Sequence, residues 1–128
     1  MVDIIQIMKT QKQKIGGAGE DLAVKYLKKK HYKIIGRNFI ADKYGEIDII
    51  AQDKGELVFI EVKTKTDEQF GLPEQEFTYQ KKKKLRRAIQ NYLFKKYWLD
   101  KEWRVDLIAV EFLGQEPDIR HHENIFLI

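Results

Sequence analysis

The residues best suited to chemistry are an aspartate, a glutamate and a lysine in two neighbouring apolar segments. Asp48 interrupts the apolar run 47–51, and Glu61 and Lys63 come directly after the apolar run 57–60. Charged side chains in such segments are costly unless they are paired, bound to a metal or open to a cleft. Two carboxylates beside a lysine could bind a divalent cation, orient a water molecule and stabilise developing charge on a phosphate.

The expected register of a β-hairpin decides whether the two carboxylates meet. Residues 45–52 and 56–64 are predicted as strands, with a turn signal between them. If Lys54-Gly55 is a two-residue turn, Asp48 lies opposite Glu61 and both side chains share one face. A three-residue loop without a bulge would send them to opposite faces. Two carboxylates so close repel each other, and a hard cation such as Mg²⁺ or Mn²⁺ would remove the conflict.

The alternative interpretation is an edge strand on which Glu61 and Lys63 form solvated surface pairs. An aspartate followed by Glu-x-Lys arises easily by chance in a chain with 34% charged residues. However, the segment 57–62 is apolar on both of its alternating faces, which is typical of a central strand. This context strengthens the case for a site, and the solvated surface pair stays the open alternative.

The hydrophobic periodicity predicts one α/β domain in which helices pack on a mixed sheet. We expect residues 1–15 to form a flexible or loosely ordered arm, Gly16-Gly17 to be a break, and residues 16–128 to form a single domain. The predicted order is a helix from Ala18 to about Lys30, strands near 34–38, 45–52 and 56–64, a helix over 78–98, and strands over 103–112 and 119–126, with a turn near 114–118.

Composition narrows the class of protein further. The 128 residues include no cysteine, which excludes disulfides, thiolate nucleophiles and cysteine-ligated zinc. No apolar run is long enough to span a bilayer, and the first residues lack the pattern of a signal peptide. We therefore expect a cytoplasmic protein without a membrane partner.

The second predicted helix carries an unusual excess of positive charge. Between residues 78 and 98 there is no acidic residue. The cations are Lys81, Lys82, Lys83, Lys84, Arg86, Arg87, Lys95 and Lys96. Such a run is often only a solvated face, but eight cations without a counter-charge predict contact with a nucleic-acid phosphate backbone.

Four further residues are candidates for the metal chemistry. Glu20 could be a third acid or simply a favourable charge in a first helical turn. Glu46 shares strand parity with Asp48 and is a weaker third acid. His121 and His122 could bind a metal, but a strand end near the surface is the favoured interpretation.

Other polar and aromatic residues are expected to be structural. Arg104 and Asp106 share one strand face and are expected to form an ion pair. Four aromatic residues are predicted to belong to the core rather than to a base-stacking platform: Tyr92, Tyr97, Trp98 and Trp103.

These motifs resemble a known family. Gly45-Glu46-Ile47-Asp48 followed by residues 58–63 resembles the bipartite PD-(D/E)xK nuclease motif, and nearly the whole chain after residue 15 resembles the YraN-like bacterial family. The matching segments are Gly16 to Leu27 with Gly19-Glu20, then Arg37-Asn38, Phe70 to Pro73, Lys81 to Leu93, Arg104 to Asp106 and His122 to Phe126. The departures are Lys65, where the family usually has arginine, and Ile125, where it usually has alanine.

The resemblance implies a restriction-endonuclease-like fold, with a mixed central sheet of about five strands flanked by helices. It also implies similarity to archaeal Holliday-junction resolvases, in which a glutamate on the first helix corresponds to Glu20, and hence a homodimer. The expected function is metal-dependent hydrolysis of nucleic-acid phosphodiester bonds, in DNA rather than RNA and on branched DNA. The alternatives are a non-catalytic nucleic-acid-binding module, or a subunit active only within a larger assembly.

Overall fold

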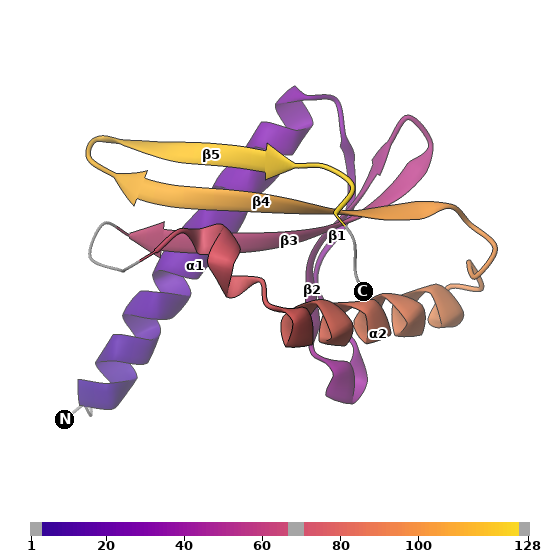
Figure 1. Cartoon of the computed structure of the whole chain (residues 1–128), viewed down its shortest axis with the longest axis horizontal. Coiled ribbons are helices and arrows are strands. Elements are labelled where there is room, and N and C mark those ends of the chain that lie inside the picture. The colour runs from indigo at the N-terminus through magenta and orange to yellow at the C-terminus, as the bar shows by residue number, and fades with distance from the viewer. Residues whose placement is uncertain (1–3, 67–70, 126–128) are drawn as a thin grey trace.

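The computed structural model describes residues 4–66 and 71–125, with side chains from Lys14 onward. Along the chain (Figure 1) lie α1 (Ile4–Lys29), β1 (Lys33–Ile40), the 3₁₀ helix η1 (Asp42–Tyr44), β2 (Glu46–Asp53), β3 (Glu56–Thr66), the 3₁₀ helix η2 (Pro73–Glu76), α2 (Tyr79–Lys95), β4 (Trp103–Leu113) and β5 (Glu116–His122). This is the predicted order of helix, three strands, helix and two strands.

The described strands form one mixed sheet in the order β1-β2-β3-β4-β5. The pair β3–β4 is parallel and the other pairs are antiparallel. A parallel pair needs a crossover connection, which α2 supplies. β3 is therefore the central strand, and the edge-strand interpretation of Glu61 and Lys63 is wrong.

The β2–β3 hairpin has the predicted two-residue turn. Lys54 and Gly55 adopt φ angles of 52° and 86°, and Asp53 faces Glu56 in the strand register. Positive φ at both central residues is the signature of a type I′ turn, which matches the natural twist of the flanking strands. The register that this turn sets runs without interruption as far as Ile49 and Ile60.

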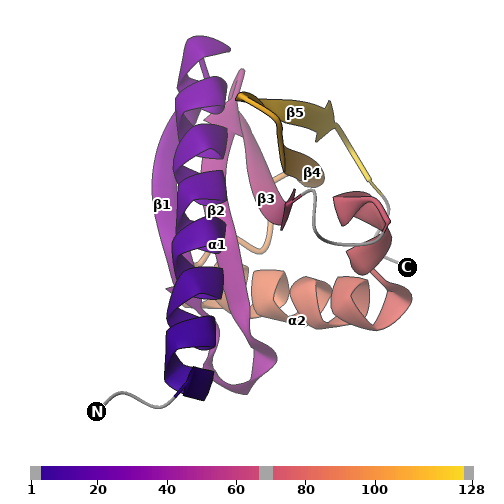
Figure 2. The same cartoon turned by 90° about the vertical axis from the view of Figure 1, so that its left-hand side faces the viewer.

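Apolar side chains form two cores, one on each face of the sheet. Ala23, Val24 and Leu27 of α1 pack on one face. The residues of α2 that pack on the other face are Leu85, Ala88, Ile89, Tyr92 and Leu93. Figure 2 shows α1 running lengthwise across the sheet with α2 on the other side. The predicted fold class, an α/β domain with a five-stranded mixed sheet flanked by helices, is confirmed.

The first helix is longer than its sequence suggests. α1 begins at Ile4 and continues through Gly16 and Gly17, so the expected break at these glycines is wrong. Glycine lowers helix propensity without preventing a helix, and packing against the sheet outweighs this cost. The flexibility of the segment 1–15 stays a prediction. No helix among the described residues is long and apolar enough to cross a membrane.

A third glycine of α1 has a distinct role, because it lets the helix approach β3 closely. A Cβ atom on Gly19 would lie 2.1 Å from Thr64 Oγ1 and 3.1 Å from Thr64 Cγ2, too close for any side chain. Thr64 is β-branched and cannot easily turn away. This contact fixes the height of α1 above the sheet, and therefore also the position of the next residue, Glu20.

The remaining differences from the predicted elements lie at their ends. α2 is capped by Thr78, whose side chain accepts a hydrogen bond from the Lys81 N–H, and it ends at Lys95 rather than near residue 98. β5 starts at Glu116, so the predicted turn is confined to the residues around Gly114, where φ is 66°. Phe126, the expected end of the last strand, lies outside the described residues.

Arg104 is the centre of a buried polar cluster at one end of the sheet. Its guanidinium donates to Asp106 Oδ1 at 3.0 Å, which confirms the expected ion pair. It also donates to the Tyr32 hydroxyl and to carboxylates of Asp53 and Glu56, at 2.8 to 3.1 Å. The cluster thereby joins β4 to the β2–β3 turn and to the residue that precedes β1.

The Gly19 contact can be tested with two alanine substitutions in α1. Gly19→Ala should lower the free energy of unfolding by about 1–3 kcal/mol, because its Cβ has no space beside Thr64. A Cβ atom on Gly17 would have no neighbour within 4 Å. Gly17→Ala should therefore raise the free energy of unfolding by about 0.5–1 kcal/mol.

Urea denaturation of the two variants beside the wild type is the measurement. A loss of stability in Gly17→Ala equal to that in Gly19→Ala would contradict a helix that continues through Gly17.

Candidate active site

The Asp48 carboxylate lies where the regular pairing of β2 with β3 ends. The strand register stops at Ile49 and Ile60, so the expected pairing of Asp48 directly opposite Glu61 is not part of it. Instead the Val62 N–H donates to Asp48 Oδ2 at 2.8 Å. Ile47 packs in the core under α2, whereas Ile49 packs in the core under α1, so the alternation of faces is broken between them. The Asp48 side chain therefore accepts a hydrogen bond from the Val62 N–H at the point where the alternation of faces in β2 is broken.

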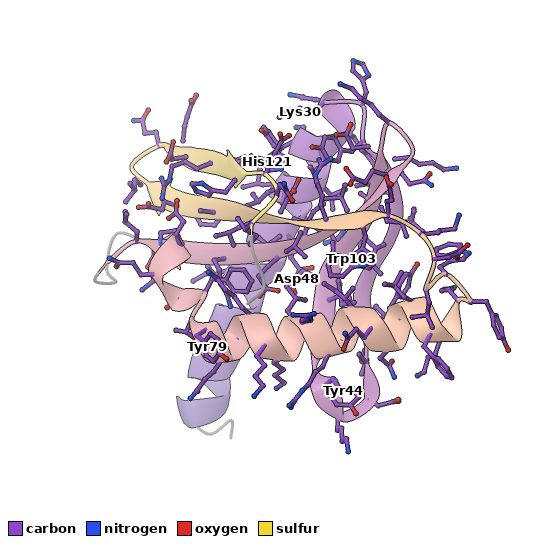
Figure 3. All side chains as sticks on the ribbon, turned by 45° about the vertical axis from the view of Figure 1, so that its right-hand side comes forward. Lys30, Tyr44, Asp48, Tyr79, Trp103 and His121 are labelled. Carbon is purple, nitrogen blue, oxygen red and sulfur yellow. The ribbon has the colours of Figure 1, made fainter. Side chains whose placement is uncertain are left out.

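The predicted acidic site is assembled in one hollow of about 380 Å³. Glu20 of α1, Asp48 of β2, and Glu61 and Lys63 of β3 all line it. The hollow also contains residues that were not predicted as site residues: Ile15, Gly16, Val62, Thr64 and Glu76. The expected convergence of Asp48, Glu61 and Lys63 is confirmed, and Figure 3 shows Asp48 near the centre of the molecule.

Three carboxylates come close enough to share a cation. Oxygen atoms of Glu20, Glu46 and Asp48 lie within 4.8 Å of one another. The amide of Asn38, oriented so that its nitrogen donates, reaches Glu20 Oε1 at 2.9 Å and Glu46 Oε1 at 2.6 Å. Arg37 lies 3.7 Å from Glu20 Oε1. From the sequence, Glu46 ranked below Glu20, and Asn38 was named only as part of the matching segment Arg37-Asn38 and not as a site residue.

Burial and mutual repulsion make these carboxyl groups hard to ionise. Burial raises the pKa of Glu20 to about 7, and the Asp48 charge adds to the shift. Burial also raises the pKa of Asp48 to about 6, although the hydrogen bond from Val62 opposes it. The pKa of Glu61 rises to about 7, again through burial and then through Asp48. Groups in this state gain from a nearby cation, because it lowers the cost of their charge.

Glu61 and Lys63 form an ion pair within the hollow. Lys63 Nζ lies 3.2 Å from Glu61 Oε1. The Lys63 side chain is 17% exposed and the Glu61 side chain is 14% exposed. Next along β3, Lys65 pairs with Glu76 of η2 at 3.1 Å. Lys63 is therefore held within reach of both the carboxylates and anything that enters the hollow.

A second, smaller hollow of about 150 Å³ joins the acidic site to α2. It shares Glu61 and Lys63 with the first hollow and is lined on its other side by Lys81 and Lys84. The Lys84 side chain crosses Gly45, where an added Cβ would lie 2.9 Å from Lys84 Cε. Two of the predicted phosphate-binding lysines thus border the site itself.

The other predicted cations of α2 lie on its outer surface. Lys83, Arg86 and Arg87 are exposed and Lys82 is half-buried. The expectation that the helix lacks a counter-charge is wrong at Lys95, which pairs with Asp42 of η1 at 3.3 Å. The sequence could not show this pair, because its partner is supplied by a distant segment.

The two histidines have different surroundings. His122 is exposed as expected and bonds Glu74 Oε2 at 2.9 Å. The surface interpretation is wrong for His121, whose side chain is 3% exposed and bonds Asp106 Oδ2 at 2.8 Å. Figure 3 shows His121 beside α1 and β5. Asp106, His121 and Glu123 also approach within 4.8 Å, but Arg104 already engages both Asp106 oxygens, so this cluster is a structural ion-pair network.

Of the four aromatic residues expected in the core, three pack in or against it and one is exposed. Tyr92 is buried, and Trp98 and Trp103 pack against the same core. Tyr97 is 91% exposed, because α2 has already ended and the chain turns at this residue with φ of 59°.

The raised pKa values predict that the effect of Asp48→Asn on the free energy of unfolding depends on pH. An acid with a higher pKa in the folded state destabilises the fold once it ionises. This penalty is absent below pH about 4, grows as the pH rises above that value, and is complete above about 6 to 7. The asparagine side chain would keep an oxygen for the Val62 N–H. Asp48→Asn should therefore raise the free energy of unfolding at pH 8 by about 1–3 kcal/mol, and have little effect at pH 4.

Thermal unfolding of the metal-free protein at both pH values measures this difference. The matched control is Asp100→Asn, which removes an exposed carboxylate and should change stability by less than about 0.5 kcal/mol. A destabilised Asp48→Asn at pH 8 would instead identify Asp48 as the partner in a stabilising ion pair.

Comparison with known proteins places the chain in a family. A family model described as "Uncharacterised protein family UPF0102" matches residues 19–110, which include Glu20, Asp48, Glu61 and Lys63. A UPF0102 protein of Geobacter metallireducens is 41% identical over 93% of this chain and 97% of its own length. One from Alkaliphilus oremlandii is 41% identical over 89% and 98%, and one from Persephonella marina is 41% identical over 87% and 91%. The chain therefore belongs to the uncharacterised protein family UPF0102.

Proposed function

We propose that this chain is a metal-dependent endonuclease of the PD-(D/E)xK type, which hydrolyses phosphodiester bonds in nucleic acid, and in DNA rather than RNA. The observation that carries the proposal is the convergence of Asp48, Glu61 and Lys63 with Glu20 in one hollow. Each of these carboxyl groups has a pKa raised by burial, which is typical of groups with a chemical role.

The donor set fits a hard divalent cation. Mg²⁺ and Mn²⁺ prefer carboxylate oxygens, and Asp48 and Glu61 would hold the ion with help from Glu20 and Glu46. A bound ion would polarise a phosphoryl oxygen and lower the pKa of water. Without a cation the crowded carboxylates are costly, so binding an ion would relieve a repulsion that the fold contains.

The lysines on either side would act on the water and on the phosphate. Lys63 would orient the attacking water and stabilise the charge that develops on the phosphate. Its contact with Glu61 at 3.2 Å holds the ammonium group beside the site. Lys81 and Lys84 line the smaller hollow and would neutralise phosphates that flank the scissile bond.

The basic surface of α2 supports nucleic acid as the substrate. Its apolar face packs on the sheet, so its exposed cations face outward beside the acidic site. The same surface also favours the alternative of a non-catalytic binding module, because phosphate contact by α2 does not require catalysis. A subunit that is active only within a larger assembly would keep both the acidic site and the basic surface of α2.

A finer proposal concerns the form of the DNA. Similarity to archaeal Holliday-junction resolvases would make branched DNA the substrate and a two-fold homodimer the active form. One domain of this size holds one site, and an enzyme that cuts both strands of a branch commonly pairs two sites by symmetry. A strictly monomeric mass by light scattering at high concentration, together with cleavage of branched DNA, would contradict the dimer.

Metal binding should separate an enzyme from a binding module. Mn²⁺ at about one hundred times its dissociation constant should stabilise the wild type by about 2.7 kcal/mol, which a thermal melt detects. Asp48→Asn should remove this shift and abolish cleavage. Lys63→Met should lower the rate about 100-fold to 1000-fold and leave the metal shift in place.

The control is Glu116→Gln, which removes an exposed carboxylate at the start of β5. It should change neither the stabilisation by Mn²⁺ nor the rate of cleavage. If the wild type shows no metal shift and no cleavage while it still binds DNA, the binding-module function replaces the nuclease.

Salt dependence should identify α2 as the phosphate-binding surface. Each phosphate contact contributes about 0.9 to the slope of log K against log salt concentration. Lys83→Gln combined with Lys84→Gln should therefore reduce the slope for duplex DNA by about 2. Fluorescence anisotropy over a range of salt concentrations measures it.

The matched control removes two exposed lysines from the end of α1, Lys28→Gln with Lys29→Gln. This pair should leave the slope unchanged. Equal reductions in both double variants would indicate a non-specific effect of net charge instead of binding by α2.

A further inference from the structure

A third hollow, of about 620 Å³, lies on the outer side of α2 where the helix meets η1. It is larger than the two hollows at the acidic site. Its lining combines two cations, two aromatic rings and two carboxamides: Lys43, Arg87, Tyr44, Phe94, Gln90 and Asn91. No step of the proposed hydrolysis uses these residues.

The aromatic side chains of this hollow are not explained by the core alone. Phe94 is 69% exposed, although its neighbours Tyr92 and Leu93 are buried. Tyr44 packs against the core on one side and lines the hollow on the other. Lys43 Nζ lies 5.6 Å from the centre of the Tyr44 ring. Exposed rings flanked by cations are the arrangement that binds unpaired bases, since the rings stack on the base and the cations neutralise its phosphates.

Shared lining residues connect this hollow to the acidic site. Tyr44 lines both the large hollow and the small one, and the small hollow shares Glu61 and Lys63 with the acidic site. Figure 3 shows Tyr44 beside α2, on the connection between β1 and β2. The small hollow thus connects the large one to the acidic site, and Lys84 of the small hollow and Arg87 of the large one lie about one turn apart on α2.

We propose that the hollow between Tyr44 and Phe94 binds an unpaired nucleotide of the strand that occupies the acidic site. The base stacks against the aromatic side chains, and its phosphate contacts Lys43 and Arg87. The substrate class is then nucleic acid with a single-stranded segment next to the cleaved bond. The inference rests on the nucleic-acid binding of the proposed function and does not depend on catalysis.

The test compares a base-bearing strand with a strand that lacks bases, in EDTA so that no cleavage occurs. The probes are a short oligothymidine and an abasic oligomer of the same length, both with intact phosphates. The wild type should bind oligothymidine about tenfold more tightly, the effect of stacking one base. Phe94→Ala should remove this preference without unfolding the protein, because the ring is exposed.

Two matched controls separate stacking from charge. Tyr97→Ala removes an aromatic ring that is 91% exposed but does not line the hollow, so the tenfold preference should remain. Arg87→Gln should weaken binding of both oligomers and lower the salt slope by about 1, whereas Lys28→Gln, at the end of α1, should not. Oligouridine tested beside oligothymidine shows whether the segment is RNA or DNA.

Equal affinity of the wild type for both oligomers, or an unchanged preference in Phe94→Ala, would overturn the proposal. So would a change in the sedimentation mass of Phe94→Ala without a change in its preference, because the exposed ring would then cover a second copy of the chain. A preference that Phe94→Ala removes, in a protein that never cleaves, would support this site and refute only the nuclease.

Discussion

The site depends on one hydrogen bond, from the Val62 N–H to the Asp48 carboxylate. This bond replaces the regular backbone pairing of β2 with β3 beyond Ile49 and Ile60. It fixes the carboxylate against the central strand, where burial makes its charge costly. Glu20 is brought to the same place by the close contact of Gly19 with β3. The Val62 hydrogen bond and the Gly19 contact thus bring the carboxylates close together, and a bound cation is the simplest way to relieve their repulsion.

Local patterns in the sequence were enough to predict the central part of this arrangement. The Lys54-Gly55 turn determines the register as far as Ile49 and Ile60, which brings Asp48 and Glu61 to the same end of the hairpin. Beyond that point Asp48 is held by the Val62 N–H and not by a cross-strand pair with Glu61. Features that depend on distant segments could not be predicted in this way. Propensity alone suggested a break at Gly16-Gly17, but the sheet supports the helix there. His121 lies in a charged stretch, and its burial results from Asp106 and from α1, neither of which is adjacent in sequence.

Opposite charges are placed side by side without cancelling. The small hollow separates the carboxylates from the lysines of α2, with Lys63 between them. Lys81 acts to lower the pKa of Glu61 but is outweighed by burial and by Asp48. A polyanion bound along α2 would therefore be attracted up to the edge of the acidic site, where a cation is needed before a phosphate can approach the carboxylates. The net charge of +4 conceals this uneven distribution.

The buried cluster around Arg104 restricts how this chain can change over evolutionary time. Its guanidinium joins Asp106, Asp53, Glu56 and the Tyr32 hydroxyl, and Asp106 also holds His121. Replacing Asp106, whose side chain is fully buried, would leave Arg104 without its buried partner at a cost of about 3–5 kcal/mol, whereas replacing several members by apolar residues can be neutral. We therefore expect related chains to keep these residues together or to exchange them as a set.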